Sequence, residues 1–192
     1  MFSKRQQQII ETAIKIIAKN GIQNLTTKNL ANEIGISEPA LYRHFNNKRE
    51  ILEGIIKYFK IMMNPAFDKM EEAEKPIQQI EIFVVTLLKI LNSNCDCARV
   101  IFSESNFQNE EVLINSINIM MNKSQQKLIA IIAKGQELKE IQAGVSSLNI
   151  SRIIIGSIRF IVVQWTMSGM IFNLETEGKQ FWSDLRKIIK VN

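Results

Sequence analysis

Residues 25–52, LTTKNLANEIGISEPALYRHFNNKREIL, carry the pattern of two short helices joined by a tight turn. Thr26 is a suitable N-cap for the first helix, and Gly35 can adopt the left-handed conformation that ends it. Ser37 can cap the second helix, where Pro39 is tolerated because it falls in the first turn. Two helices joined by a short turn that contains glycine predict a helix-turn-helix.

The second of these helices has one apolar side and one outward side. At about 100° per residue, Leu41 and Phe45 lie on the side that faces the core. The outward side is compact, and it is formed by Pro39, Ala40, Tyr42 and Arg43. A helix of this shape can lie in the major groove of DNA with its N-terminal end against the base edges. The alternative for Tyr42 is a place in the core, because its position on the helix is lateral.

Polar groups surround this outward side at the positions that phosphates would occupy. Thr26 and Thr27 bring a hydroxyl group and a backbone amide to a helix N-terminus, which is a natural phosphate site. Further candidate DNA contacts come from Lys28, Ser37, Tyr42, His44 and Lys48. No nucleophile or carboxylate accompanies His44 at a useful spacing. We therefore interpret this histidine as a phosphate contact or a helix-end packing residue, and not as a catalyst.

The same segment resembles the DNA-binding domain of the tetracycline-repressor (TetR) family of bacterial regulators. The shared pattern comprises Thr-Thr, Leu-Ala, Gly-Ile-Ser, Leu-Tyr-Arg-His-Phe and Asn-Lys followed by Leu52, and it covers residues 4 to about 55. The resemblance implies that bases face Lys28, Glu38, Pro39 and Ala40. It implies that phosphates contact Thr26, Thr27, Tyr42, His44 and Lys48. Glu38 would be an acid in the groove, where it could accept a hydrogen bond from cytosine N4 or simply face solvent.

The distribution of charge agrees with a DNA-binding N-terminal part. Residues 1–60 contain 10 Lys and Arg against 5 Asp and Glu, whereas residues 61–192 contain 14 of each. All of the net charge of +5 therefore lies in the first third of the chain. This asymmetry indicates a polyanionic partner at one end of the molecule. The alternative is a basic helical face that is merely solvated.

Helical periodicity continues to the end of the chain, which contains only 3 prolines and 8 glycines. We predict an all-α protein of about nine helices. A three-helix helix-turn-helix domain would occupy residues 1–46, and a larger helical effector-binding and dimerisation domain residues 47–192. The fourth helix is expected to end or kink at Asn64-Pro65. Later helices are expected near residues 76–92, 98–104, 110–135, 149–169 and 176–190.

The penultimate helix is apolar nearly all round, so one face needs a partner other than the subunit core. A twofold homodimer provides that partner, and the TetR resemblance implies the same assembly. We predict a four-helix interface that includes Ile154, Ile158, Val162, Phe181, Leu185 and Ile188. Two recognition helices would then read both halves of a palindrome, roughly 34 Å apart. A lipid-spanning helix is disfavoured, because Arg159 lies near its middle.

Regulators of the TetR family generally bind a small effector in the larger domain. The residues that we expect to line a hydrophobic pocket are Met62, Met63, Phe67, Phe83, Phe102, Phe107, Met120 and Trp165. The alternative for each of them is a place in the ordinary core, which Met and Phe routinely fill. Arg159 needs a partner within an apolar helix. That partner is either an acid, such as Glu81, Glu104 or Glu110, or the carboxylate or phosphate of an amphipathic ligand.

The larger part has no catalytic constellation, glycine-rich phosphate loop or metal-ligand spacing, so we expect neither an enzyme nor a cofactor. Cys95 and Cys97 form Cys-Asp-Cys, which matches neither a CxxC redox motif nor a zinc site. We expect free thiols, with a redox-sensing pair as the alternative. The N-terminus lacks the apolar core of a signal peptide, which favours the cytoplasm.

These patterns together predict a ligand-responsive transcriptional regulator, most simply a repressor. It would bind a palindromic operator in double-stranded DNA as a homodimer, and a small hydrophobic or amphipathic effector would release it. The alternative is a small-molecule-binding or adaptor protein that uses its helix-turn-helix for protein contacts. The basic first third of the chain argues against that alternative.

Overall fold

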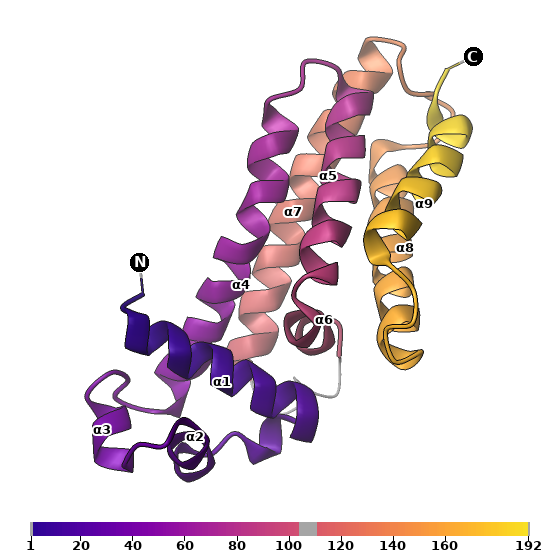
Figure 1. Cartoon of the computed structure of the whole chain (residues 1–192). Helices are drawn as coiled ribbons and strands as arrows, with labels where there is room; N and C mark the ends of the chain where they lie inside the picture. Colours follow the sequence, from indigo (N-terminus) through magenta and orange to yellow (C-terminus); the bar gives the residue numbers. More distant parts are fainter. Residues whose placement is uncertain (1, 104–110, 192) are drawn as a thin grey trace.

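The computed structural model describes residues 2–103 and 111–191, without the side chains of Val112 and Leu113. The described residues form nine α-helices, one 3-10 turn and an isolated bridge between Ile141 and Lys190, which confirms the all-α prediction (Figure 1). The helices are α1 Lys4–Asn20, α2 Thr27–Ile34, α3 Glu38–Tyr42, α4 Lys48–Glu71, α5 Pro76–Asn92, α6 Cys95–Ile101, α7 Glu111–Glu137, α8 Ser147–Met167 and α9 Leu174–Ile189; the 3-10 turn is Ile22–Asn24.

The N-terminal helices close around a core of their own. Ser3 caps α1 through a capping box with Gln6, and the isoleucines of α1 recur at helical spacing on the buried side. This core includes Ile10, Ile14, Leu30, Leu41, Phe45, Ile55 and Phe59. It continues along α4 to Phe59, beyond residue 46, and takes in Cys97, Val100 and Ile117 from the larger part of the chain. The first three turns of α4 therefore hold the N-terminal unit firmly.

The fourth helix runs on to Glu71, so of the two predicted alternatives, an end or a kink at Asn64-Pro65, the end is wrong. Proline removes one backbone hydrogen bond, the one that would reach the carbonyl of Ile61. Both of these residues face solvent, where water can satisfy that carbonyl. On the opposite side, Ala66 and Met70 are fully buried in the larger core. Burial of this side outweighs the one bond that the helix loses.

The larger part is a second core built by α4, α5, α7, α8 and α9. In Figure 1 the N-terminal unit lies at one end of the long α4 and α7 helices, with α4 and the α8–α9 pair on opposite sides of the bundle. Leu88, Ile132, Ile154, Val162 and Leu174 are each 0% exposed at its centre. α4 contributes to both cores, so it links the N-terminal unit to the larger one directly.

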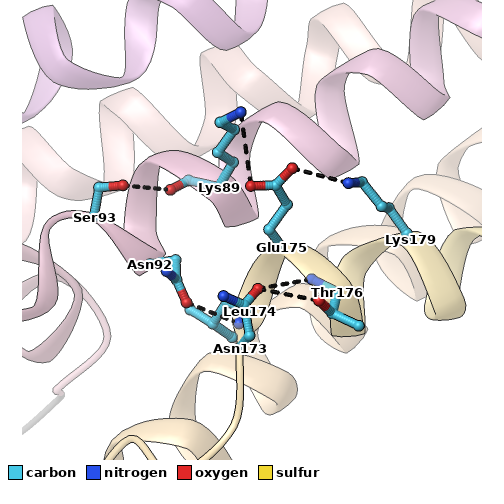
Figure 2. A network of polar contacts seen from close by, with 8 residues as sticks. All are labelled: Lys89, Asn92, Ser93, Asn173, Leu174, Glu175, Thr176 and Lys179. Atoms are coloured by element: carbon cyan, nitrogen blue, oxygen red, sulfur yellow. Dashed lines mark hydrogen bonds and ion pairs between the residues drawn. The ribbon is translucent and has the colours of Figure 1, made fainter.

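Polar contacts hold the start of α9 on the end of α5 (Figure 2). Asn92 Oδ1 accepts a hydrogen bond of 2.9 Å from the backbone N–H of Leu174. Glu175 pairs with Lys89 on α5 at 3.7 Å and with Lys179 of its own helix at 2.9 Å. The two exposed lysine pairs are worth little, so the part-buried amide contact is the stronger anchor. It sets the register of α9 on α5.

The two cysteines are free thiols in different surroundings. Cys97 belongs to α6 and is buried against the N-terminal core. Burial together with nearby Asp96 raises the pKa of its thiol to about 12. A thiol with this pKa is protonated at neutral pH and is a poor nucleophile. Cys95 is half-buried, and its sulfur lies 3.5 Å from the carbonyl oxygen of Asn92. This environment argues against a redox-sensing pair.

Candidate nucleic-acid interface and effector cavity

The α2–α3 segment is the helix-turn-helix that the sequence predicts. The hydroxyl of Thr26 caps α2 by accepting from the N–H of Asn29 at 3.1 Å, and the hydroxyl of Ser37 caps α3. Gly35 is left-handed, with φ 77°, and the next N–H, that of Ile36, returns to the carbonyl of Ala31 at 3.0 Å. The turn closes around this bond, so α3 leaves α2 in one fixed direction.

The outer side of α3 is open to solvent. Leu41 and Phe45 are buried beneath it, as the helical spacing predicts. Pro39 and Arg43 are exposed, and Tyr42 is 45% exposed, so the tyrosine is not a core residue. This side therefore meets the geometric requirement for insertion into a groove of DNA.

Glu38 and Thr27 interact across the turn. The Thr27 hydroxyl donates a hydrogen bond of 2.7 Å to Glu38 Oε2, which ties the start of α2 to the start of α3. Both residues are half-buried. The Thr27 hydroxyl is thus committed to a protein acceptor, while its backbone stays at the N-terminus of α2. The sequence offered no signal for this link, which spans 11 residues. Base contact by Glu38 and phosphate contact by Thr27 stay predictions.

The cationic and imidazole groups lie around the same surface. Lys28 and Arg43 are exposed, whereas Lys48 is half-buried and already interacts with another group. The side chain of Gln6 donates to the backbone carbonyl of His44 at 3.3 Å, which fastens α1 to the end of α3. The main chain of His44 therefore serves helix-end packing, and the residue as a whole is half-buried. Their contacts with DNA stay predictions.

Replacing Gly35 with alanine is expected to lower the free energy of unfolding by roughly 1–2 kcal/mol. No atom lies within 4 Å of the position of an added Cβ, so the whole cost comes from the left-handed backbone. Urea denaturation at one fixed protein concentration measures the change. Gly144→Ala is the matched control, because that glycine has no positive φ and should shift stability by less than about 0.5 kcal/mol. Equal effects of the two substitutions would contradict the strain argument.

A partly open apolar cavity of about 170 Å³ lies in the larger domain, between α4, α5, the end of α6, α7 and α8. Six of the predicted pocket residues line it: Met63, Phe67, Phe83, Phe102, Met120 and Arg159. Further lining residues that were not predicted at a pocket include Leu87, Ile101, Gln125 and Ile155, and Ile158, which was assigned to the dimer interface, also lines it. Whether such a side chain fills the core or lines a cavity depends on how the helices pack. The spacing of residues along a helix does not separate the two cases.

Of the other predicted pocket residues, Trp165 and Met62 do not line this cavity. Trp165 is buried in the core, where its indole N–H donates to the carbonyl of Phe172 at 2.7 Å. Met62 packs against both cores instead. Phe107 lies outside the described residues, as do Glu104 and Glu110, two of the acids considered for Arg159. Glu81, the third acid, lines a surface cleft beside Trp182 on α9. Arg159 is half-buried and interacts with another group of the subunit.

The predicted dimer residues divide into core and surface. Ile154, Ile158, Val162 and Leu185 are buried within the subunit, so they are core positions and not part of a dimer surface. Periodicity could not separate them, because α8 is apolar on both of its sides. Phe181 is half-buried against the core, and Ile188 is 67% exposed.

The outward side of α8 carries a separate apolar stripe. Ile153, Phe160 and Met167 are spaced seven residues apart and are 47%, 62% and 82% exposed. Among the described residues, α8 is the helix that is long and apolar enough to cross a membrane by length and composition. A core helix passes the same test, and the opposite side of α8 is packed into the larger core. The stripe is therefore a surface without a partner in the single chain.

Residues 9–55 match the family model described as bacterial regulatory proteins of the tetR family, and residues 57–187 match the model for the C-terminal region of YsiA-like proteins. The chain belongs to the TetR family. As a TetR-family member it is a DNA-binding transcriptional regulator and not an enzyme.

Three known proteins resemble this TetR-family regulator over nearly its whole length. Nucleoid occlusion factor SlmA of Vibrio vulnificus (strain YJ016) is 22% identical over 190 residues, which cover 98% of this chain and 97% of SlmA. The structure of the ketosteroid transcriptional regulator KstR2 of Mycobacterium tuberculosis has a TM-score of 0.84 at 15% identity, with 100% and 98% covered. FadR from Bacillus subtilis, in complex with stearoyl-CoA, has a TM-score of 0.81 at 22% identity, with 93% and 96% covered. At these identities the likeness to the solved structures shows the fold.

Proposed function

We propose that this protein is a ligand-responsive repressor that binds a palindromic operator as a homodimer in the cytoplasm. The observation that carries the proposal is the course of α4. Its first turns lie in the core of the helix-turn-helix unit through Ile51, Ile55 and Phe59, and its later turns line the apolar cavity through Met63 and Phe67. A ligand that displaces the later turns would move the recognition helix with them.

A second copy of the chain is the partner that suits the stripe on α8. The heptad spacing of Ile153, Phe160 and Met167 favours packing against a helix of similar pattern. Gly156 lies on the same helix with no atom within 4 Å of an added Cβ, so a partner helix could approach closely there. The exposed Ile188 of α9 would extend the contact. A twofold axis through this surface would pair two recognition helices for successive major grooves.

The effector that suits the cavity is a hydrophobic or amphipathic molecule. Its lining is mostly Phe, Met, Leu and Ile, and the few polar members include Gln125 and Arg159. Two proteins of the same fold support this class: FadR was solved with stearoyl-CoA, and KstR2 is described as a ketosteroid regulator. We therefore propose a lipid-like effector for this chain.

The affinity for the operator is expected to fall steeply with salt. If each subunit neutralises ~4 phosphates, log K should fall with log salt at a slope of about −7 for the dimer. Fluorescence anisotropy with the DNA upstream of the protein's own gene, titrated at several salt concentrations, gives this slope. Lys139→Gln, which changes an exposed lysine of the larger domain, is the control and should leave the slope unchanged. If the affinity for the operator did not change with salt, DNA binding through phosphate contacts would be contradicted.

The second candidate function is that of a DNA-bound factor without an effector, and the SlmA relatives favour it because they are named nucleoid occlusion factors. The two functions differ in their response to effector. A repressor should leave its operator when a lipid-like ligand is added, whereas a DNA-bound factor should stay on it. An adaptor that uses its helix-turn-helix for protein contacts should not bind the operator at all. Operator binding that persists unchanged with every lipid probe below would favour a DNA-bound factor that has no effector.

A further inference from the structure

A second hollow adjoins the apolar cavity on the outer side of the larger domain. It is a cleft of about 450 Å³ between α4 and α7. The charged and polar residues that line it are Lys60, Asn64, Asp68, Lys123, Ser124 and Lys127. Three of these side chains are cationic and one, that of Asp68, is anionic. The lining of the cleft therefore carries an excess of positive charge.

The cleft and the cavity share a wall. Met63, Phe67, Met120 and Ser124 line both spaces. Phe67 lies at the centre of this wall, because its ring centroid is 5.1 Å from that of Phe83 in the cavity and 5.3 Å from Lys127 Nζ in the cleft. The two methionines beside it are unbranched and change rotamer at little cost. Small side-chain movements would therefore join the two spaces.

The sizes of the two spaces indicate that they act together. The cavity of about 170 Å³ is smaller than the roughly 300–1,000 Å³ of ordinary ligand pockets. The cleft is large enough in volume, but its charged side chains could not hold an apolar molecule well. One ligand with an apolar part and an anionic part would satisfy both spaces at once.

Building on the proposed function, we propose that the α4–α7 cleft binds the phosphate-bearing headgroup of an amphipathic effector whose acyl chain enters the apolar cavity. Lys60 and Lys123 make no ion pair with a residue that the structure describes. Lys127 pairs with Glu71 at 2.7 Å, but both side chains are substantially exposed, so an incoming phosphate can compete for this lysine. Lysine ammonium groups bind phosphate as mobile point charges, and three of them suit a headgroup with more than one negative charge.

The orientation follows from the charges at the two ends. Arg159 lines the cavity on the α8 side, but it is one cation and already has an interaction within the subunit. The cleft offers three cations and open access for a bulky polar group. The headgroup therefore lies between α4 and α7. Its contacts with Lys60 and Asn64 would act on α4 itself, the helix that carries the recognition unit.

The proposal is tested by isothermal titration calorimetry on the full-length protein. The probes are palmitoyl-CoA, palmitoyl lysophosphatidate, palmitate and CoA alone. Palmitoyl-CoA and palmitoyl lysophosphatidate each combine an acyl chain with phosphate; the first is a CoA thioester and the second is a phospholipid. At least one of these two should bind at least about tenfold more tightly than palmitate or CoA alone. Whichever of the two binds identifies the source of the headgroup.

The decisive variant replaces Lys60, Lys123 and Lys127 with glutamine. Because the three side chains are on the surface, this variant should fold normally, and circular dichroism checks that it does. It should bind the phosphate-bearing probe about tenfold more weakly than wild type and palmitate equally well. The matched control replaces Lys69, Lys75 and Lys134, three exposed lysines away from the cleft, and should bind like wild type. Arg159→Ala should have a smaller effect on the phosphate-bearing probe than the cleft variant.

The outcomes separate the two proposals. If no probe binds to the wild-type protein, the lipid-like effector of the proposed function fails, and the headgroup site fails with it. If a probe binds to wild type and the cleft variant binds it equally well, the headgroup site alone is overturned. A larger loss in Arg159→Ala than in the cleft variant would likewise overturn it, because the headgroup would then lie at the opposite end.

Discussion

Replacing Phe160 with glutamate is expected to dissociate the dimer and to weaken operator binding at least about 100-fold. Phe160 is 62% exposed at the middle of the α8 stripe, so the single chain tolerates a charge there. In a twofold dimer the same position would be covered by the partner helix. An unpaired carboxylate buried at such a surface costs roughly 3–5 kcal/mol. Since about 1.4 kcal/mol is a factor of ten, the dissociation constant of the dimer should rise by at least about 100-fold.

The loss of DNA affinity follows from the loss of the dimer. A monomer offers one recognition helix, and it gains nothing from the second half-site of a palindrome. Analytical ultracentrifugation gives the association state, and anisotropy with the operator gives the affinity at the same protein concentrations. The variant should keep the far-ultraviolet circular dichroism of the wild type, because the substituted side chain leaves the subunit core untouched.

Ile61→Glu is the matched control for this experiment. Ile61 is also a half-exposed apolar residue in the middle of a long helix, but it lies on α4, on the other side of the bundle from α8 (Figure 1). The control should remain dimeric and bind the operator normally. A Phe160→Glu protein that stays fully dimeric would show that the second copy packs elsewhere.

Replacing Phe59 with alanine is expected to lower the free energy of unfolding by roughly 3–5 kcal/mol. Phe59 is 0% exposed, and it lies where the N-terminal core meets Cys97 and Val100 of α6 and Ile117 of α7. Removing the ring loses its apolar burial and leaves a cavity between rigid helices that cannot collapse to fill it. Because the stability of a typical domain is only about 5–15 kcal/mol, this one change would remove a large share of it.

Chemical denaturation followed by circular dichroism measures this loss, at one protein concentration so that dimerisation does not distort the comparison. Ile61→Ala lies two residues further along the same helix and serves as the control. Its side chain is half-exposed, so the loss should stay below about 1 kcal/mol. A Phe59→Ala protein as stable as this control would mean that the N-terminal core does not depend on its junction with α6 and α7.

The helix-turn-helix could be predicted closely because its signals are local. Thr26, Gly35 and Ser37 act on the backbone within a few residues of themselves, and each performs the expected role in the structure. The link from Thr27 to Glu38 could not be predicted, since it depends on how α3 leaves the turn. Pro65 shows the reverse case, where a strong local signal for helix termination is overridden by the burial of Ala66 and Met70.

The larger domain was predictable in kind but not in detail. Its helices follow from apolar spacing, and six residues expected at a pocket do line the cavity. The dimer surface was assigned to Ile154, Ile158 and Val162, which are buried, while Ile153 and Phe160 on the same helix are exposed. When a helix is apolar on both sides, its sequence does not show which side faces inward. In the α4–α7 cleft, Lys60 is far in sequence from Lys123 and Lys127, so the three lysines could not be grouped beforehand.

The sequence by itself determined that this chain is helical, that its basic N-terminal part forms a helix-turn-helix, and that its larger part is apolar beyond the needs of one core. Those properties depend on the chemistry of neighbouring residues and on the 3.6-residue period of the helix. Tertiary structure alone decided which side of α8 is exposed, that α4 continues past its proline, and that a lysine cleft adjoins an apolar cavity. Each of these depends on which helices pack together, and packing is set by the summed burial of many distant side chains.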